Sequence, residues 1–99
     1  MALRYASRKD QNQKTIVDGL RKVGIRVHVL NDRDIPDLLV GYRGRLYLFE
    51  IKDGEQIPSR RKLRPGQQKF MDEWAGYPIH KVESLAAAYA ALGIEIRET

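Results

Sequence analysis

The feature that most restricts the fold is a long, mostly apolar stretch at residues 35–53, which reads IPDLLVGYRGRLYLFEIKD. Its leucine, valine and aromatic residues are typical of β-strands, and the dipeptide Arg43-Gly44 in its middle marks a turn. These signals predict a hairpin of two antiparallel strands at residues 38–42 and 46–52. The fold is therefore expected to be built on a β-sheet.

The chain before this hairpin carries one helix pattern and one strand pattern. Four apolar residues fall on one stripe at helical spacing: Ile16, Val17, Leu20 and Val23. This stripe predicts a helix over residues 8–23, which Gly24 ends. Apolar and polar residues alternate over residues 25–30, which predicts a half-buried strand. The polar residues 31–34 then predict a turn.

After the hairpin, a charged loop leads to a second helix, a strand and a third helix. Pro65 suits the first turn of a helix, because its missing N–H would be unpaired there, and it opens a helix predicted over residues 65–75. Residues 79–82 predict a short strand. Ser84 is a good N-cap for the alanine-rich segment at residues 85–92, which predicts the third helix.

The predicted element order is α-β-β-β-α-β-α. An early hairpin and a later crossover strand give a mixed sheet flanked by helices, which is an α/β fold. A length of 99 residues fits one domain, residues 1–99. For residues 94–99, an added edge strand and a frayed end both remain open.

Composition and charge narrow the class of protein. No apolar run approaches the roughly 18–20 residues of a membrane helix, and no apolar h-region follows the N-terminus, so we expect neither a membrane span nor a signal peptide. The chain has no cysteine, which excludes disulfides and thiolate zinc sites and favours a reducing cytoplasm. Its formal net charge of +5 favours a polyanionic partner, with nucleic acid ahead of an acidic membrane surface.

Part of the positive charge is concentrated in one short segment that contains Arg60, Arg61, Lys62 and Arg64. A run of this kind is either a solvated loop or a loop that contacts phosphates. The second interpretation predicts that these residues bind the phosphates of a nucleic acid.

The predicted hairpin carries charged residues at one end. Glu50 and Lys52 are two residues apart, so they share a face of their strand. Asp37 precedes the other strand, and it is nearly as far from the turn at residues 43–44 as Glu50 is. An antiparallel hairpin with this turn brings the three charged groups together.

These charged groups suit a divalent metal. Two carboxylates held close together cost free energy unless a cation lies between them, and an oxygen-rich pair suits Mg²⁺ or Mn²⁺. Such an ion with a nearby lysine is the equipment for phosphodiester hydrolysis, because both stabilise negative charge on the phosphate. The simpler interpretation is that Asp37 caps a turn and that Glu50 and Lys52 form a solvated ion pair. The combination of all three residues on one hairpin favours the site.

The same residues resemble a known nuclease signature. Pro36-Asp37, twelve further residues and then Glu50-Ile51-Lys52 look like the PD-(D/E)xK motif. The surrounding segments IPDLLVG, RLYLFEIKDG, KLRPGQQKFMDEW and PIHKVES, in this order, are similar to the VRR-NUC (virus-type replication-repair nuclease) branch of that superfamily. The resemblance covers about residues 10–93.

The resemblance implies a restriction-endonuclease-like core and a metal-dependent active site. It implies that Asp37, Glu50 and the backbone carbonyl of Ile51 bind Mg²⁺ or Mn²⁺, and that Lys52 is the catalytic lysine. Family members often carry a glutamine at the start of the helix after this lysine, and Gln67 matches that position.

The chain departs from the family on the first predicted helix, where relatives often place a glutamate that reaches the metal. Residues 10–23 contain no glutamate. Gln13 extends the inward stripe and Asn12 is its neighbour, so either is expected to contribute a neutral oxygen or to orient a water. His28 and His80 are expected to be packed or exposed rather than metal ligands.

The resemblance further implies a structure-specific endodeoxyribonuclease of DNA repair and recombination, in a bacterial or phage-infected cell. Its implied substrate class is branched DNA, such as four-way (Holliday) junctions. A two-fold junction is naturally met by a two-fold dimer, so we expect a homodimer. The missing glutamate supports an alternative, a catalytically weak or inactive nucleic-acid-binding protein with a nuclease fold. A small subunit that works only beside a larger partner is a third possibility.

Overall fold

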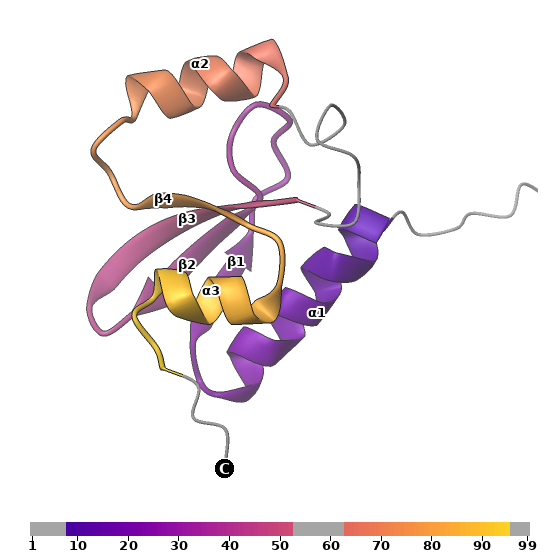
Figure 1. The fold of residues 1–99 in the computed structure, drawn as a ribbon, viewed down its shortest axis with the longest axis vertical. Helices are drawn as coiled ribbons and strands as arrows, with labels where there is room; N and C mark the ends of the chain where they lie inside the picture. Colours follow the sequence, from indigo (N-terminus) through magenta and orange to yellow (C-terminus); the bar gives the residue numbers. More distant parts are fainter. Residues whose placement is uncertain (1–7, 53–62, 96–99) are drawn as a thin grey trace, which may run out of the picture.

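The protein is described by a computed structural model that covers residues 8–52 and 63–95. Figure 1 shows the elements in chain order: α1 (Arg8–Lys22), β1 (Arg26–Val29), β2 (Leu38–Tyr42), β3 (Arg45–Ile51), α2 (Pro65–Glu73), β4 (Ile79–Val82) and α3 (Leu85–Ala91). This order confirms the predicted sequence of elements, α-β-β-β-α-β-α.

The strands form one mixed sheet in the order β1-β2-β3-β4. β2 pairs antiparallel with both β1 and β3, whereas β3 and β4 are parallel and are connected through α2. Arg43 and Gly44 join β2 to β3 with positive φ angles of 49° and 76°. Positive φ at both central residues is what a two-residue type I′ hairpin requires, so the turn lies where the sequence predicted it.

The helices cover the two faces of the sheet unequally. α1 and α3 lie against one face, and α2 lies on the opposite side (Figure 1). Because side chains alternate along a strand, every second residue of the hairpin points toward α1 and α3. The buried apolar core consists of Ile16, Val17, Leu20, Ile25, Leu38, Val40, Phe49, Ile51, Val82, Ala88 and Leu92.

A close helix contact holds α1 against α3. A Cβ atom added at Gly19 would collide with the side chain of Leu85, so the absence of a side chain lets α3 approach α1 closely. The hydroxyl of Tyr89 also donates to the carbonyl oxygen of Gly19, at 3.3 Å. Ser84 accepts a hydrogen bond from the N–H of Ala87 at 3.0 Å, which is the predicted N-cap of α3.

Two local predictions were wrong or lie partly outside the described residues. Val23 was placed on the buried stripe of the first helix, but α1 ends at Lys22 and Val23 is 60% exposed in the turn that follows. Ile94 and Glu95 form no strand, and residues 96–99 lie outside the described residues.

Candidate functional site

The register of the hairpin places Asp37 directly beyond the pair Leu38 and Phe49, opposite Glu50. The Asp37 side chain is fixed by the backbone of β3, because the N–H of Ile51 donates to Asp37 Oδ2 at 2.7 Å. The Asp37 carbonyl in turn accepts from the N–H of Leu30 at 2.8 Å. The predicted meeting of residues 37 and 50 at one end of the hairpin is therefore present.

Glu50 is a carboxylate in the interior, with only 2% of its surface exposed. Its Oε1 accepts from Gln67 Nε2 at 2.8 Å and lies 3.4 Å from Lys52 Nζ. A buried charge is tolerated only when it is paired and hydrogen-bonded, and these two partners supply both conditions. Lys52 is itself largely covered, with 12% of its side chain exposed.

Gln67 brings α2 to this cluster. Pro65 is the first residue of α2, and Gln67 follows in the same turn, 6% exposed. Its Oε1 accepts from the backbone N–H of Arg64 at 3.0 Å, while its Nε2 is bonded to Glu50. One side-chain amide therefore caps the helix and orients the buried carboxylate.

Asn12 acts through its nitrogen rather than its oxygen. Its Nδ2 donates to the carbonyl of Lys52 and to the carbonyl of Glu83, both at 2.8 Å. The Lys52 N–H is meanwhile bonded to the Val82 carbonyl at 2.9 Å. α1 therefore uses this amide nitrogen to hold the ends of β3 and β4 together beside Lys52. A role of the Asn12 oxygen toward the metal or a water stays a prediction.

An open pocket of about 370 Å³ lies next to the cluster. Its lining combines acids, amides and two arginines: Asp10, Gln13, Leu30, Asn31, Asp32, Arg33, Asp37, Arg64 and Gln67. Gln13 thus reaches the neighbourhood of Asp37, as its place on the α1 stripe suggested.

Asp10 is a pocket residue that the sequence reading passed over. It lies three residues before Gln13 and seven before Val17, so the same helical spacing extends to it. Within residues 8–52 and 63–95, however, no group of three or more acidic, histidine or cysteine side chains is close enough to hold one metal ion.

A comparison with solved structures finds the same arrangement of helices and strands in another protein. A solved structure described as a "VRR_NUC domain" superposes on this chain with a TM-score of 0.68, covering 89% of this chain and 97% of the other, at 23% sequence identity. The chain has the fold of a VRR_NUC domain. No family model matches the sequence, and no curated protein matches it either.

The donor set of this VRR_NUC fold is compatible with Mg²⁺ or Mn²⁺. Asp37 and Glu50 supply two carboxylates on neighbouring strands, and the carbonyl of Ile51 lies on the chain between Glu50 and Lys52. Hard, oxygen-only ligands of this type are those that Mg²⁺ and Mn²⁺ prefer. Gln67 and Lys52 hold Glu50 in place through Oε1, which orders the carboxylate before any ion binds.

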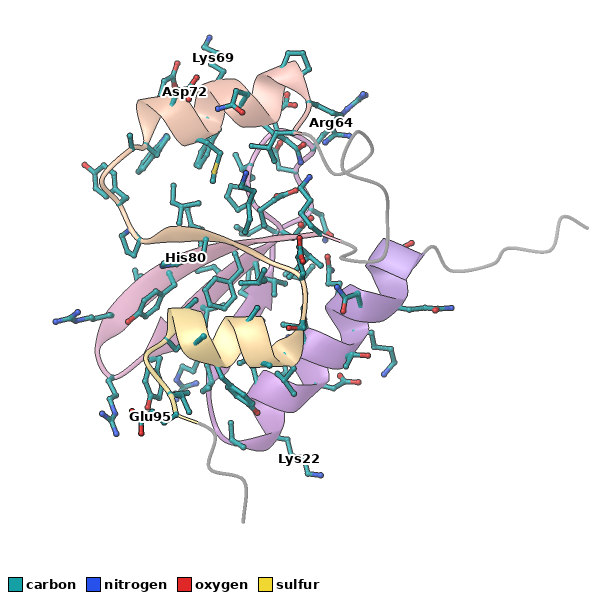
Figure 2. The ribbon with its side chains drawn as sticks, in the orientation of Figure 1. Lys22, Arg64, Lys69, Asp72, His80 and Glu95 are labelled. Carbon is teal, nitrogen blue, oxygen red and sulfur yellow. The ribbon has the colours of Figure 1, made fainter. Side chains whose placement is uncertain are left out.

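Of the residues predicted to contact DNA, Arg64 belongs to the part of the chain that the structure describes. Arg64 is exposed next to the start of α2 (Figure 2). Its guanidinium donates to the carbonyl of Arg33, and both residues line the pocket. The other predicted DNA contacts, Arg60, Arg61 and Lys62, lie outside the described residues.

The two histidines differ in their surroundings. His28 is exposed, and His80 lies 6.2 and 6.1 Å from the ring centroids of Tyr47 and Phe49. Neither belongs to a metal-binding group within the described ranges. None of the helices among the described residues has the length and apolar character needed to cross a membrane.

Proposed function

We propose that this chain is a VRR-NUC-type nuclease that hydrolyses phosphodiester bonds of DNA with Mg²⁺ or Mn²⁺. The observation that carries the proposal is the buried Glu50, which is bonded to Gln67 and Lys52 and lies across the hairpin from Asp37. A fold that needed only a packed sheet would gain nothing from a buried carboxylate at this position. The overall fold shared with a VRR_NUC domain supports the same assignment.

The ligands we propose for the ion are Asp37, Glu50 and the Ile51 carbonyl. When bound, the ion polarises the scissile phosphate and makes water a better nucleophile at neutral pH. Lys52 places its ammonium 3.4 Å from Glu50, where it stabilises the negative charge that develops on the phosphate. Gln67 orients Glu50 throughout.

The pocket beside the cluster is proposed to receive the DNA backbone. Arg33 and Arg64 lie on its lining together with Asp37, and the two arginines are joined through the Arg33 carbonyl. Guanidinium groups bind phosphates with two parallel hydrogen bonds, so this side of the pocket suits a phosphate next to the one that is cut. Contacts of this kind recognise the shape of a backbone rather than a base sequence, which suits branched DNA.

A homodimer is part of this proposal. Three large apolar side chains are exposed near β3 and the segment that leads into β4: Leu46 (66%), Trp74 (42%) and Tyr77 (62%). The ring centroids of Trp74 and Tyr77 are 5.2 Å apart, so these two side chains form one exposed aromatic pair. Exposed apolar side chains grouped in this way are typical of a surface that another protein covers.

The spacing of the acids among the described residues favours a second candidate function, a nucleic-acid-binding protein with little or no catalytic activity. Within the described residues the acids do not form a group of three, which leaves the site with less negative charge to hold an ion. This candidate keeps the fold and the DNA contacts but predicts no cleavage.

Cleavage assays distinguish the two functions. Labelled four-way junction, linear duplex and single strand are incubated with Mg²⁺, Mn²⁺ or EDTA. The nuclease proposal predicts metal-dependent cutting, strongest on the junction, that Asp37→Ala abolishes. Binding without cutting in both metals would leave the second candidate.

A further inference from the structure

The end of the molecule away from the candidate site is strongly basic. Five exposed cations lie there: Arg21, Lys22, Arg26, Arg43 and Arg45. We call this set the basic end. Figure 2 places Lys22 at the lower end of the molecule, together with Glu95, whereas Arg64 lies near the start of α2 at the upper end.

Strand pairing brings Arg26, Arg43 and Arg45 to one end of the sheet, where Arg26 and Arg45 lie on opposite faces. Arg26 pairs with Gly41, two residues before Arg43 at the hairpin tip. Arg45 pairs with Tyr42, and the guanidinium of Arg43 lies 5.3 Å from the centre of the Tyr42 ring. The cations are therefore held on regular elements rather than on a long loop.

Arg21 links the C-terminal end of α1 to the same place. Its Nη2 donates to the carbonyl of Val27 at 3.0 Å, and Arg21 and Arg26 both line an open pocket of about 390 Å³. Val27 belongs to β1, which is an edge strand. The side chain of Arg21 covers part of that edge, which disfavours pairing with a strand of another protein.

The length of β2 separates the candidate site from the basic end. β2 runs from beside Asp37 to Tyr42, which is about 17 Å at ~3.3 Å per residue. Along duplex DNA that distance corresponds to roughly five base pairs at 3.4 Å per step. A duplex arm that leaves the candidate site along the sheet therefore carries several phosphates past the basic end.

We propose that the basic end is a second DNA-binding site, which binds the phosphates of a duplex arm about five base pairs from the cleaved bond. This inference rests on the proposed function for its choice of DNA. The cations come from three different elements, α1, β1 and the hairpin tip, and the fold brings them to the same end of the molecule. An excess of positive charge fits a polyanion better than the mixed charges of an ordinary protein surface.

The test compares two charge-matched double variants. Arg26→Gln with Arg45→Gln removes two cations from the basic end. Lys14→Gln with Lys69→Gln removes two exposed cations elsewhere, each of which forms an ion pair one helical turn away with Asp18 or Glu73. Affinity for a labelled four-way junction with arms of 15 base pairs is measured in EDTA at several salt concentrations.

The basic-end variant is expected to lower the slope of log affinity against log salt by about 1–2, since each lost phosphate contact removes ~0.9. The control variant is expected to change this slope by less than ~0.45, which is half of the value for one phosphate contact. Equal effects of both variants, or no effect of either, overturn the proposal. A shift in oligomeric state without a change of slope would assign the surface to a protein partner and also overturn it.

The outcome is separable from that of the proposed function, because binding in EDTA requires no cleavage. An active nuclease whose basic-end variant keeps the wild-type slope contradicts only the second site. A protein that never cuts but shows the reduced slope keeps the second site and loses the nuclease assignment.

Discussion

Gln67 donates a hydrogen bond of 2.8 Å to Glu50, and this contact joins the first turn of α2 to the end of β3. The amide that makes it is 6% exposed and the carboxylate 2% exposed, so the bond is shielded from water. The position of α2 and the orientation of the buried acid are therefore coupled.

The coupling predicts that Gln67→Ala costs stability and activity together. A buried carboxylate that loses a donor costs about 1–3 kcal/mol, and the free energy of unfolding from urea titration should fall by that amount. Junction cleavage should fall in parallel because Glu50 loses its orientation. Gln68→Ala is the matched control, since Gln68 is exposed and its side-chain amide donates to the exposed Asp72 at 2.9 Å. Similar losses of stability and activity in both variants would contradict a specific role for the hydrogen bond between Gln67 and Glu50.

Asn12 yields a prediction about the position of Lys52. Removal of the amide in Asn12→Ala frees the carbonyls of Lys52 and Glu83, which it bonds at 2.8 Å. We expect kcat to fall about ten- to a hundredfold with KM nearly unchanged, because misplacement of a catalytic group slows the chemical step. Gln11→Ala, on the exposed face of α1, should behave as wild type. A rise in KM at constant kcat would place Asn12 in substrate binding instead.

The contact between α1 and α3 predicts the effect of a single added methyl group. Gly19→Ala puts a Cβ into the side chain of Leu85, and overpacking of this kind costs about 1–3 kcal/mol. Thermal or urea unfolding should show the loss, and the double variant with Leu85→Ala should cost less than the sum of the two single variants. Gly41→Ala is the control, since its Cβ would meet Arg26 at an ordinary 3.7 Å. Simple additivity would contradict the close approach.

A single charged substitution on the exposed apolar surface tests the proposed homodimer. Tyr77→Arg introduces a cation beside Trp74, whose ring centroid is 5.2 Å from that of Tyr77, and light scattering should show a monomer where the wild type is a dimer. Val23→Arg places the same charge at another exposed apolar residue, 60% exposed, and should leave the dimer intact. A wild-type protein that is monomeric at micromolar concentration would refute the homodimer directly.

Some contacts of the candidate site could be predicted from the sequence and others could not, because only some of them depend on local spacing. The alternation of strand residues and the central turn were enough to bring Asp37, Glu50 and Lys52 together, because a two-residue hairpin fixes its own register. The contacts of Asn12 reach 40 and 71 residues along the chain, and no local pattern specifies such partners. Its position beside the site was predicted, but the atom that it uses was not.

Other differences also have local causes. Val23 follows the helical spacing of α1 but comes after its last residue, so the period continues in the sequence where the helix does not. Asp10 obeys the same spacing at the other end of α1 and does line the pocket. The C-terminal boundary of α1 decided the case of Val23, and helix boundaries are the part of a periodic pattern that is least defined by sequence.

The central claim is metal-dependent hydrolysis at the cluster of Asp37, Glu50 and Lys52, and single-turnover cleavage of a labelled four-way junction tests it most directly. With Mg²⁺ or Mn²⁺, Lys52→Ala is expected to cut about 10²–10³-fold more slowly than wild type, the usual loss when one group that stabilises transition-state charge is removed. Lys69→Ala, which removes an exposed lysine on α2, is expected to cut within twofold of wild type. Equal rates for the two variants, or cleavage by the wild type that persists in EDTA, would contradict the account.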